Sequence, residues 1–168
     1  MGRMASSRAG TPATRVLTDA GVDFAEHAYR HDPSAPSYGP EAAAALGVPA
    51  GSVFKTLVVQ GPSGLAVGVV PVERRLDLKA MAQALGVKSV AMAPVADAER
   101  SSGYVAGGIS PLGQRRALPT VLDDSARRWP RVYVSGGRRG FDVSVAPEDL
   151  ARLTGAAFAP IAAQGGEA

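Results

Sequence analysis

The chain has 168 residues, a mass of 17.1 kDa and a formal net charge of +3; 46% of its residues are hydrophobic and 20% are charged. This length and composition suit a single packed domain and exclude an intrinsically disordered chain. Because cysteine is absent, disulfides, thiolate zinc sites, iron–sulfur clusters and a cysteine nucleophile are excluded.

Capping residues, closing glycines and apolar patterns divide the chain into short elements. Thr11 followed by Pro12 is a typical helix start, and Asp77 caps a later helix that Gly86 ends. In chain order we predict helix 12–20, strand 22–29, loop 30–39, helix 40–46, strand 53–59, turn 61–64, strand 65–72, helix 78–85, strand 87–92, helix 94–100, glycine-rich loop 103–113, strand 117–122, strand 132–135, turn 136–140, strand 141–145, helix 147–153 and strand 157–161.

The short strands, many of them in hairpins, predict one mixed α/β domain rather than a regular series of βαβ units. We expect residues 11–162 to form this domain, with a flexible N-terminal tail over 1–10 and a C-terminal tail over 163–168. No apolar run approaches the roughly 18 residues that cross a bilayer, so no membrane partner is expected. With no secretory signal and no cysteine, we expect a cytoplasmic protein.

Basic residues gather in one part of the chain. Residues 100–139 carry eight Arg and two Asp, whereas residues 1–99 are balanced and residues 140–168 carry one Arg and four acids. Such a segment attracts polyanions, so it favours contact with a nucleic acid. The alternative is a solvated surface of an arginine-rich protein, which the ratio of 15 Arg to 3 Lys supports.

Lys55 is the most informative single residue, because it lies within the apolar run VFKTLVV. A lysine in a buried strand is costly unless it is paired or its pKa falls. One interpretation is a cation that contacts a substrate in a pocket. The other is a strand-edge lysine whose ammonium group reaches water.

Two glycine-rich segments are candidate anion-binding loops: GGISPLG, which begins at Gly107 and Gly108, and GGRRG, which begins at Gly136. Each is also compatible with an ordinary tight turn. His27 and His31 have no accompanying ligand cluster, so neither a metal nor a cofactor is expected. Ser110 and Ser135 lack the G-x-S-x-G pattern of a hydrolase nucleophile.

An ordered set of motifs spans about residues 11–161. It comprises H-x-Y-x-HDP at 27–33, FKTL at 54–57, GY-x-x-GGISPLGQ at 103–114 and YVSGG-x-RG at 133–140. In this order the motifs closely resemble the YbaK/EbsC family of stand-alone aminoacyl-tRNA deacylases. That family is related to the editing domain inserted in bacterial prolyl-tRNA synthetases.

The resemblance implies a compact α/β fold in which a curved mixed sheet closes towards a barrel, with helices packed around it. It implies hydrolysis of the ester of a mischarged tRNA, most typically Cys-tRNA(Pro), with prolyl-tRNA synthetase as a partner. Alternatives are a deacylase of Ala- or Ser-charged tRNA, and a catalytically silent module that binds tRNA or a synthetase. A general basic RNA-binding protein would rest on the arginines alone.

The resemblance also implies roles for individual residues. Lys55 matches the family's essential pocket lysine, and Gly107 or Gly108 supplies a backbone amide that faces the substrate carbonyl. The attacking group would be the substrate's own thiol or a water molecule. The residues expected to bind substrate are Tyr29, Phe54, Thr56, Ile109, Ser110, Ser135, Gly136 and Asp142.

Overall fold

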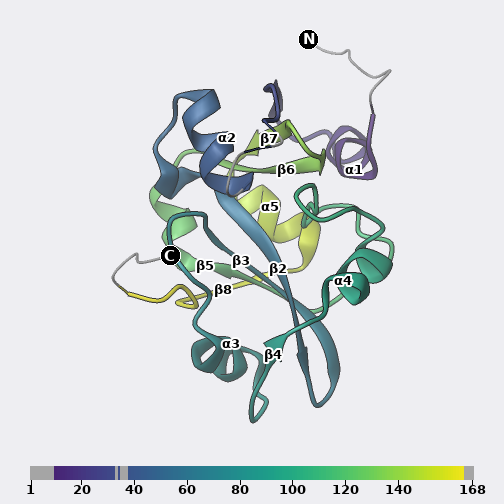
Figure 1. Ribbon diagram of the computed structural model, residues 1–168, viewed down its shortest axis with the longest axis vertical. Helices are drawn as coiled ribbons and strands as arrows, with labels where there is room; N and C mark the ends of the chain where they lie inside the picture. Colours follow the sequence, from purple (N-terminus) through teal and green to yellow (C-terminus); the bar gives the residue numbers. More distant parts are fainter. Residues whose placement is uncertain (1–9, 33, 35–37, 165–168) are drawn as a thin grey trace.

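The computed structural model describes residues 10–32, 34 and 38–164, and these form two β-sheets with helices between and around them (Figure 1). The larger sheet has the order β4-β2-β3-β5-β8. Its strands are β2 (Phe54–Gly61), β3 (Gly64–Pro71), β4 (Ala91–Met92), β5 (Thr120–Asp123) and β8 (Ala157–Ala159).

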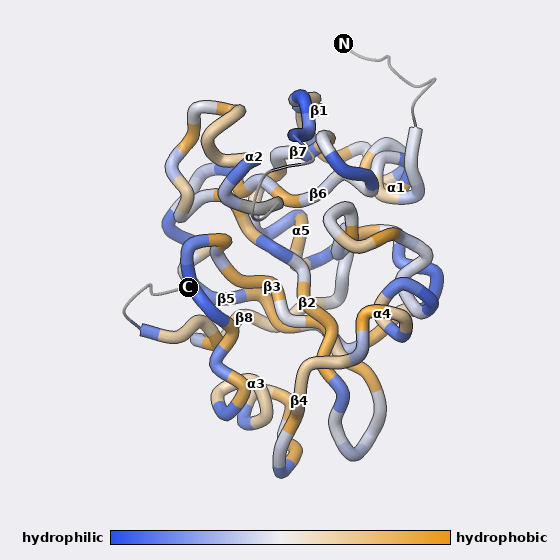
Figure 2. Tube along the Cα trace, in the orientation of Figure 1, coloured by the Kyte–Doolittle hydropathy of each residue, from blue (hydrophilic) through white to orange (hydrophobic). Residues whose placement is uncertain are grey.

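Strands β2 and β3 form the predicted hairpin and are the longest strands of the larger sheet. The apolar sequence of β3 suits its largely buried position, whereas β2 has Lys55 and Thr56 half-buried and Gln60 exposed. The tube of Figure 2 is apolar over much of both strands and hydrophilic at the polar residues of β2. Strand β5 pairs parallel with β3, and β8 pairs parallel with β5. The sheet is therefore mixed, as the sequence predicts.

The smaller sheet has the order β1-β7-β6 and is antiparallel throughout. It contains β1 (Phe24–Ala28), β6 (Val132–Arg138) and β7 (Phe141–Val145). A parallel bridge between Val53 and Tyr133 links the two sheets at one point. The expected single curved sheet closing towards a barrel is thus wrong: the strands divide into two sheets that meet at a junction and do not close.

The helices mostly follow the predicted caps. The hydroxyl of Thr11 accepts a hydrogen bond from the Thr14 amide, and the carboxylate of Asp77 accepts from the amides of Lys79 and Ala80. The helices are α1 (Pro12–Ala20), α2 (Tyr38–Leu46), α3 (Leu78–Leu85), α4 (Val95–Ser102) and α5 (Pro147–Thr154), with the 3-10 turns η2 (Ala50–Ser52) and η3 (Asp124–Arg128).

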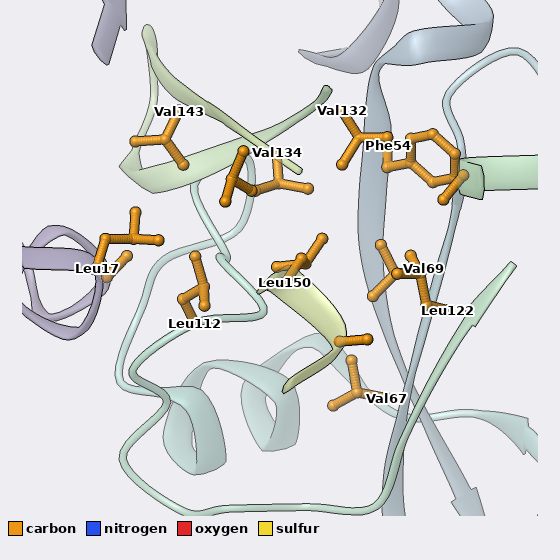
Figure 3. Packing of buried hydrophobic residues seen from close by; sticks show 14 of the residues in the cluster. Leu17, Phe54, Val67, Val69, Leu112, Leu122, Val132, Val134, Val143 and Leu150 are labelled. Atoms are coloured by element: carbon orange, nitrogen blue, oxygen red, sulfur yellow. The ribbon is translucent and has the colours of Figure 1, made fainter. Parts of the chain in front are cut away.

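The main hydrophobic core lies between the two sheets, where α5 is inserted (Figures 1 and 3). Leu150 of α5 packs in a cluster with Val134 of the smaller sheet and Val69 of the larger one, and all three are nearly fully buried. Leu17 of α1 and Leu112 of the glycine-rich loop close the same cluster (Figure 3). Helix α3 covers a second cluster against the larger sheet, through Met81.

Several predicted boundaries are wrong by a few residues. The expected strand 87–92 is reduced to β4, and β6 runs on through residues predicted as a turn, with a register shift between Ser135 and Arg138. Helix α2 begins within the predicted loop 30–39, and neither 3-10 turn was predicted. The predicted tails lie largely outside the described residues. Ala163 is described, and its amide donates to the Arg75 carbonyl at 2.8 Å.

Candidate functional site

A cavity of about 480 Å³ opens where the two sheets meet, which is within the usual range for small-molecule sites. Its wall is built from several elements: strand β2, the end of β1, helices α2 and α4, the glycine-rich loop, and strands β6 and β7. The lining residues are Tyr29, Pro40, Ala42, Val53, Phe54, Lys55, Thr56, Leu57, Val58, Val72, Met92, Ala93, Val95, Ala98, Ala106, Gly107, Ile109, Ser135 and Asp142.

Lys55 is the one basic side chain among the described residues of this wall. Strand β2 holds it opposite Val70, and it is half-buried with no hydrogen-bond or ion-pair partner in the described part of the chain. Burial lowers the pKa of its ammonium group, and the nearby charge of Arg75 lowers that pKa further. The structure thus places Lys55 in the wall of a cavity, and its role in ester cleavage stays a prediction.

Asp142 is the corresponding acidic residue of the wall. It lies on the central strand β7, between His27 of β1 and Ser135 of β6, and is only 5% exposed. Burial raises the pKa of its carboxyl group to about 7. Near neutral pH this group therefore exchanges a proton readily, unlike an exposed aspartate.

Tyr29 follows β1 and is held by a hydrogen bond from its amide to the Gly140 carbonyl at 2.9 Å. Burial, followed by the charges of Asp142 and Glu41, raises the pKa of its phenol to about 12. Tyr29 therefore stays a neutral hydrogen-bond donor at physiological pH.

Thr56 carries an unusual polar atom. Its Oγ1 is buried and has no hydrogen-bond partner in the described part of the chain, although almost every buried hydroxyl in proteins finds one. An unsatisfied hydroxyl beside a cavity is a group that a bound molecule could satisfy.

The glycine-rich loop presents one free backbone donor. Gly107 has a φ of 85°, a conformation that favours glycine, and its amide has no hydrogen-bond acceptor among the described residues. The amide of Gly108 donates to the Val105 carbonyl at 2.8 Å. Of the two amides that the sequence offered, the one of Gly107 is therefore available to a ligand.

Three of the predicted site residues lie outside the cavity wall. Gly108 packs against the turn after β6, so closely that an added Cβ would lie 2.7 Å from the Cα of Arg138. Ser110 is fully buried, and its hydroxyl accepts from the Leu112 amide. A Cβ added to Gly136 would lie 2.5 Å from a ring carbon of Phe141. These residues shape the wall rather than line it.

The sequence analysis missed the wall contributed by β4 and α4. Met92 and Val95 line the cavity although they are 48% and 62% exposed, and Ala98 lies one helical turn further along. The sequence shows only that these residues are apolar, and their exposure is known from the structure alone. Single exposed apolar residues are also too common to indicate a site.

The histidines and several arginines have structural partners. The ring of His27 lies 2.8 Å from the Ser144 hydroxyl, and the ring of His31 lies 3.0 Å from the carboxylate of Glu41. Arg131 pairs with Asp23, and the guanidinium of Arg127 stacks on the ring of Phe158. Within the described residues, no three His, Cys, Asp or Glu side chains gather to hold a metal ion. No described helix is long and apolar enough to span a membrane.

A family model described as an aminoacyl-tRNA editing domain matches residues 32–153. The Enterococcus faecalis protein EbsC, described as a Cys-tRNA(Pro)/Cys-tRNA(Cys) deacylase, is 42% identical over 120 residues, which cover 71% of this chain and 73% of that protein. The chain therefore belongs to the aminoacyl-tRNA editing domain family. The resemblance drawn from the motifs is confirmed.

Solved structures agree with this assignment. One, described as a trans-editing enzyme for prolyl-tRNA synthetase, superposes with a TM-score of 0.75 at 27% identity and covers 91% of this chain and 98% of its own. Another, described as a hypothetical protein, gives a TM-score of 0.80 at 26% identity, with 91% and 100% covered.

Proposed function

We propose that this protein is a trans-editing deacylase that hydrolyses the ester between cysteine and the 3′ end of proline tRNA. The observation that carries the proposal is the cavity that combines an unpartnered lysine, a free glycine amide and a carboxyl group with a pKa of about 7. The relative EbsC, whose described substrates are Cys-tRNA(Pro) and Cys-tRNA(Cys), supports the choice of cysteine.

Each of these groups has a role in ester cleavage. The amide of Gly107 donates to the oxygen of the ester carbonyl as negative charge develops there. The ammonium group of Lys55 holds the aminoacyl group or the terminal nucleotide in a reactive orientation. The carboxylate of Asp142 accepts the proton of the attacking group, for which a pKa near the working pH is well matched.

In the cysteine reaction the attacking atom belongs to the substrate. The thiol sulfur, after losing its proton to Asp142, attacks the ester carbonyl carbon. The bond to the ribose oxygen breaks, and that oxygen takes up the proton held by Asp142 as the tRNA leaves, which returns Asp142 to its carboxylate form. Water then opens the cyclic thioester to free cysteine. This route requires no protein nucleophile, which agrees with a chain that contains no cysteine.

A second candidate is a deacylase of Ala- or Ser-charged tRNA, in which a water molecule attacks. The Asp142 carboxyl group, with a pKa of about 7, would serve this candidate equally well as a general base for water. Both candidates meet the same need. A synthetase pocket that accepts proline rejects similar or smaller side chains only weakly, so a second site removes the errors.

The proposed partners are mischarged tRNA and prolyl-tRNA synthetase, which would present the mischarged product in the cytoplasm. Support for the synthetase comes from the similar solved structure described as its trans-editing enzyme. Formation of a ternary complex with tRNA and synthetase tests this part, and its absence in size-exclusion chromatography at micromolar concentration would contradict it.

Single-turnover hydrolysis of Cys-tRNA(Pro), Ala-tRNA(Pro) and Pro-tRNA(Pro) tests the substrate. Loss of the cysteinyl ester alone supports the thiol route. Hydrolysis of the alanyl ester would indicate that a water molecule attacks, because alanine has no thiol. If no ester is hydrolysed by the folded protein, the deacylase proposal is wrong.

A further inference from the structure

The peptide unit that carries the free amide is held by a charged side chain from another part of the fold. The guanidinium Nε of Arg139, at the turn between β6 and β7, donates to the Ala106 carbonyl at 2.8 Å. The amide of Ala106 in turn donates to the carboxylate of Glu99, on α4, at 2.8 Å. Arg139 thus holds the peptide unit between residues 106 and 107, and Glu99 holds the unit between residues 105 and 106.

The geometry of a trans peptide makes the first of these contacts important. The Ala106 carbonyl and the Gly107 amide belong to one planar unit, in which C=O and N–H point in opposite directions. No described peptide bond is cis. Because Arg139 holds the carbonyl end of this unit, it also fixes the direction of the N–H end, and both Ala106 and Gly107 line the cavity.

The turn that carries Arg139 is itself fixed against the glycine-rich loop. An added Cβ at Gly108 would lie 2.7 to 2.9 Å from three backbone atoms of Arg138 and Arg139, so the two backbones are in direct contact. The same turn accepts the Tyr29 amide through the Gly140 carbonyl. Arg139, whose side chain is exposed, therefore reaches the Ala106 carbonyl from a turn whose backbone packs against the glycine-rich loop.

We propose that Arg139 is a positioning residue for ester cleavage: through the Ala106 carbonyl it orients and polarises the Gly107 amide that stabilises the developing oxyanion. Glu99 supports it by fixing the preceding peptide unit. The inference rests on the proposed deacylase function. A hydrogen bond from a cation to a carbonyl is stronger than a neutral one, and it strengthens the donor at the other end of the same peptide.

The test compares single-turnover rates on the aminoacyl-tRNA that the wild type cleaves best. Arg139→Ala is expected to lower the rate at saturating enzyme about tenfold or more, with half-saturation unchanged within about twofold, because a preorganised donor is worth 10²–10³ in rate and only part of it is lost. Arg139→Lys retains a cationic donor and should recover part of the rate. Arg116→Ala, which removes an exposed arginine elsewhere in the basic segment, is the charge-matched control.

Glu99 provides a second pair of variants. Glu99→Gln keeps an acceptor oxygen for the Ala106 amide and should retain most of the rate, whereas Glu99→Ala should lower it. A structural readout needs no substrate: in ¹⁵N- and ¹³C-labelled protein, the resonances of the Ala106 carbonyl and the Gly107 amide should shift in Arg139→Ala and stay unchanged in Arg116→Ala.

The outcomes separate the two proposals. If the wild type cleaves no ester, the deacylase proposal fails. If the wild type is active and Arg139→Ala is equally active, the positioning role is wrong. The positioning role is also wrong if Arg139→Ala leaves the saturated rate unchanged but raises the enzyme concentration at half-saturation and weakens the salt dependence of that concentration. That result would mean that Arg139 contacts tRNA phosphates.

Discussion

Replacing Gly108 by alanine should damage activity far more than stability. The φ of Gly108 is not in the left-handed region, so the backbone tolerates alanine, but the new Cβ would lie 2.7 Å from the Cα of Arg138. Ordinary contact begins at 3.4 Å, and the opposing atoms are backbone that cannot rotate away. The glycine-rich loop must therefore move by about 0.7 Å, and it carries the Gly107 amide with it.

The structure gives the scale of both effects. Forcing one extra carbon into a close backbone contact costs about 1–3 kcal/mol, which corresponds to a fall in Tm of about 2 to 12 °C for a domain of this size. A misplacement approaching 1 Å of a catalytic donor costs about 10²-fold in rate. We expect Gly108→Ala to fold, to melt a few degrees lower, and to hydrolyse the ester about 10²-fold more slowly.

Gly86→Ala is a matched control. Gly86 ends α3 and is not among the residues that line the cavity, and it has a φ of 73° with no atom within 4 Å of an added Cβ. Its replacement costs about 1–2 kcal/mol through backbone conformation alone. Thermal melts and single-turnover assays of both variants give the answer. Equal activity of Gly108→Ala and Gly86→Ala would refute the argument that the close backbone contact positions the amide.

Three further variants test the other groups of the cavity. Lys55→Ala should abolish hydrolysis while circular dichroism and Tm remain close to wild type; a fully active variant would exclude Lys55 from the reaction. Thr56→Val, which removes a buried hydroxyl without a partner, should raise the free energy of unfolding by about 1 kcal/mol in urea titrations and slow hydrolysis, whereas a loss of stability would show that Oγ1 is satisfied. Because burial raises the pKa of Asp142 to about 7, the folded state binds more protons than the unfolded state between about pH 4 and 7. The contribution of Asp142 to stability is therefore present at pH 4 and is lost as the pH rises to 7, by an upper limit of about 4 kcal/mol. In Asp142→Asn the free energy of unfolding should lack this fall, and equal pH profiles of wild type and variant would contradict the raised pKa.

The elements that local chemistry specifies were predictable from the sequence. A capping side chain and a closing glycine define α1 and α3, and the Val-rich hairpin of β2 and β3 follows from two apolar runs around a turn. The start of β6 at Val132 was predicted, but its end at Arg138 was not. Gly136 and Gly137 indicate a turn by composition, yet they continue the strand through a register shift between Ser135 and Arg138. The Phe141 ring packs where a side chain at Gly136 would be, so that glycine serves packing rather than a turn.

The division of the strands into two sheets could also not be predicted from the sequence. It depends on α5 inserting Leu150 between the sheets, which is a matter of long-range packing rather than local preference. The candidate site shows the same limit. Lys55 stands out in an apolar strand, but the choice of the Gly107 amide over that of Gly108 depends on one hydrogen bond to the Val105 carbonyl. The contact between Arg139 and Ala106 joins residues 33 positions apart.

The most direct test of the account is the single-turnover hydrolysis of Cys-tRNA(Pro) by the wild type and by Lys55→Ala, with Pro-tRNA(Pro) as the correctly charged control. The account predicts rapid loss of the cysteinyl ester with the wild type, no loss above the spontaneous rate with Lys55→Ala, and an intact prolyl ester with both. Equal hydrolysis of the cysteinyl ester by the two proteins would show that Lys55 takes no part in the reaction and would contradict the account.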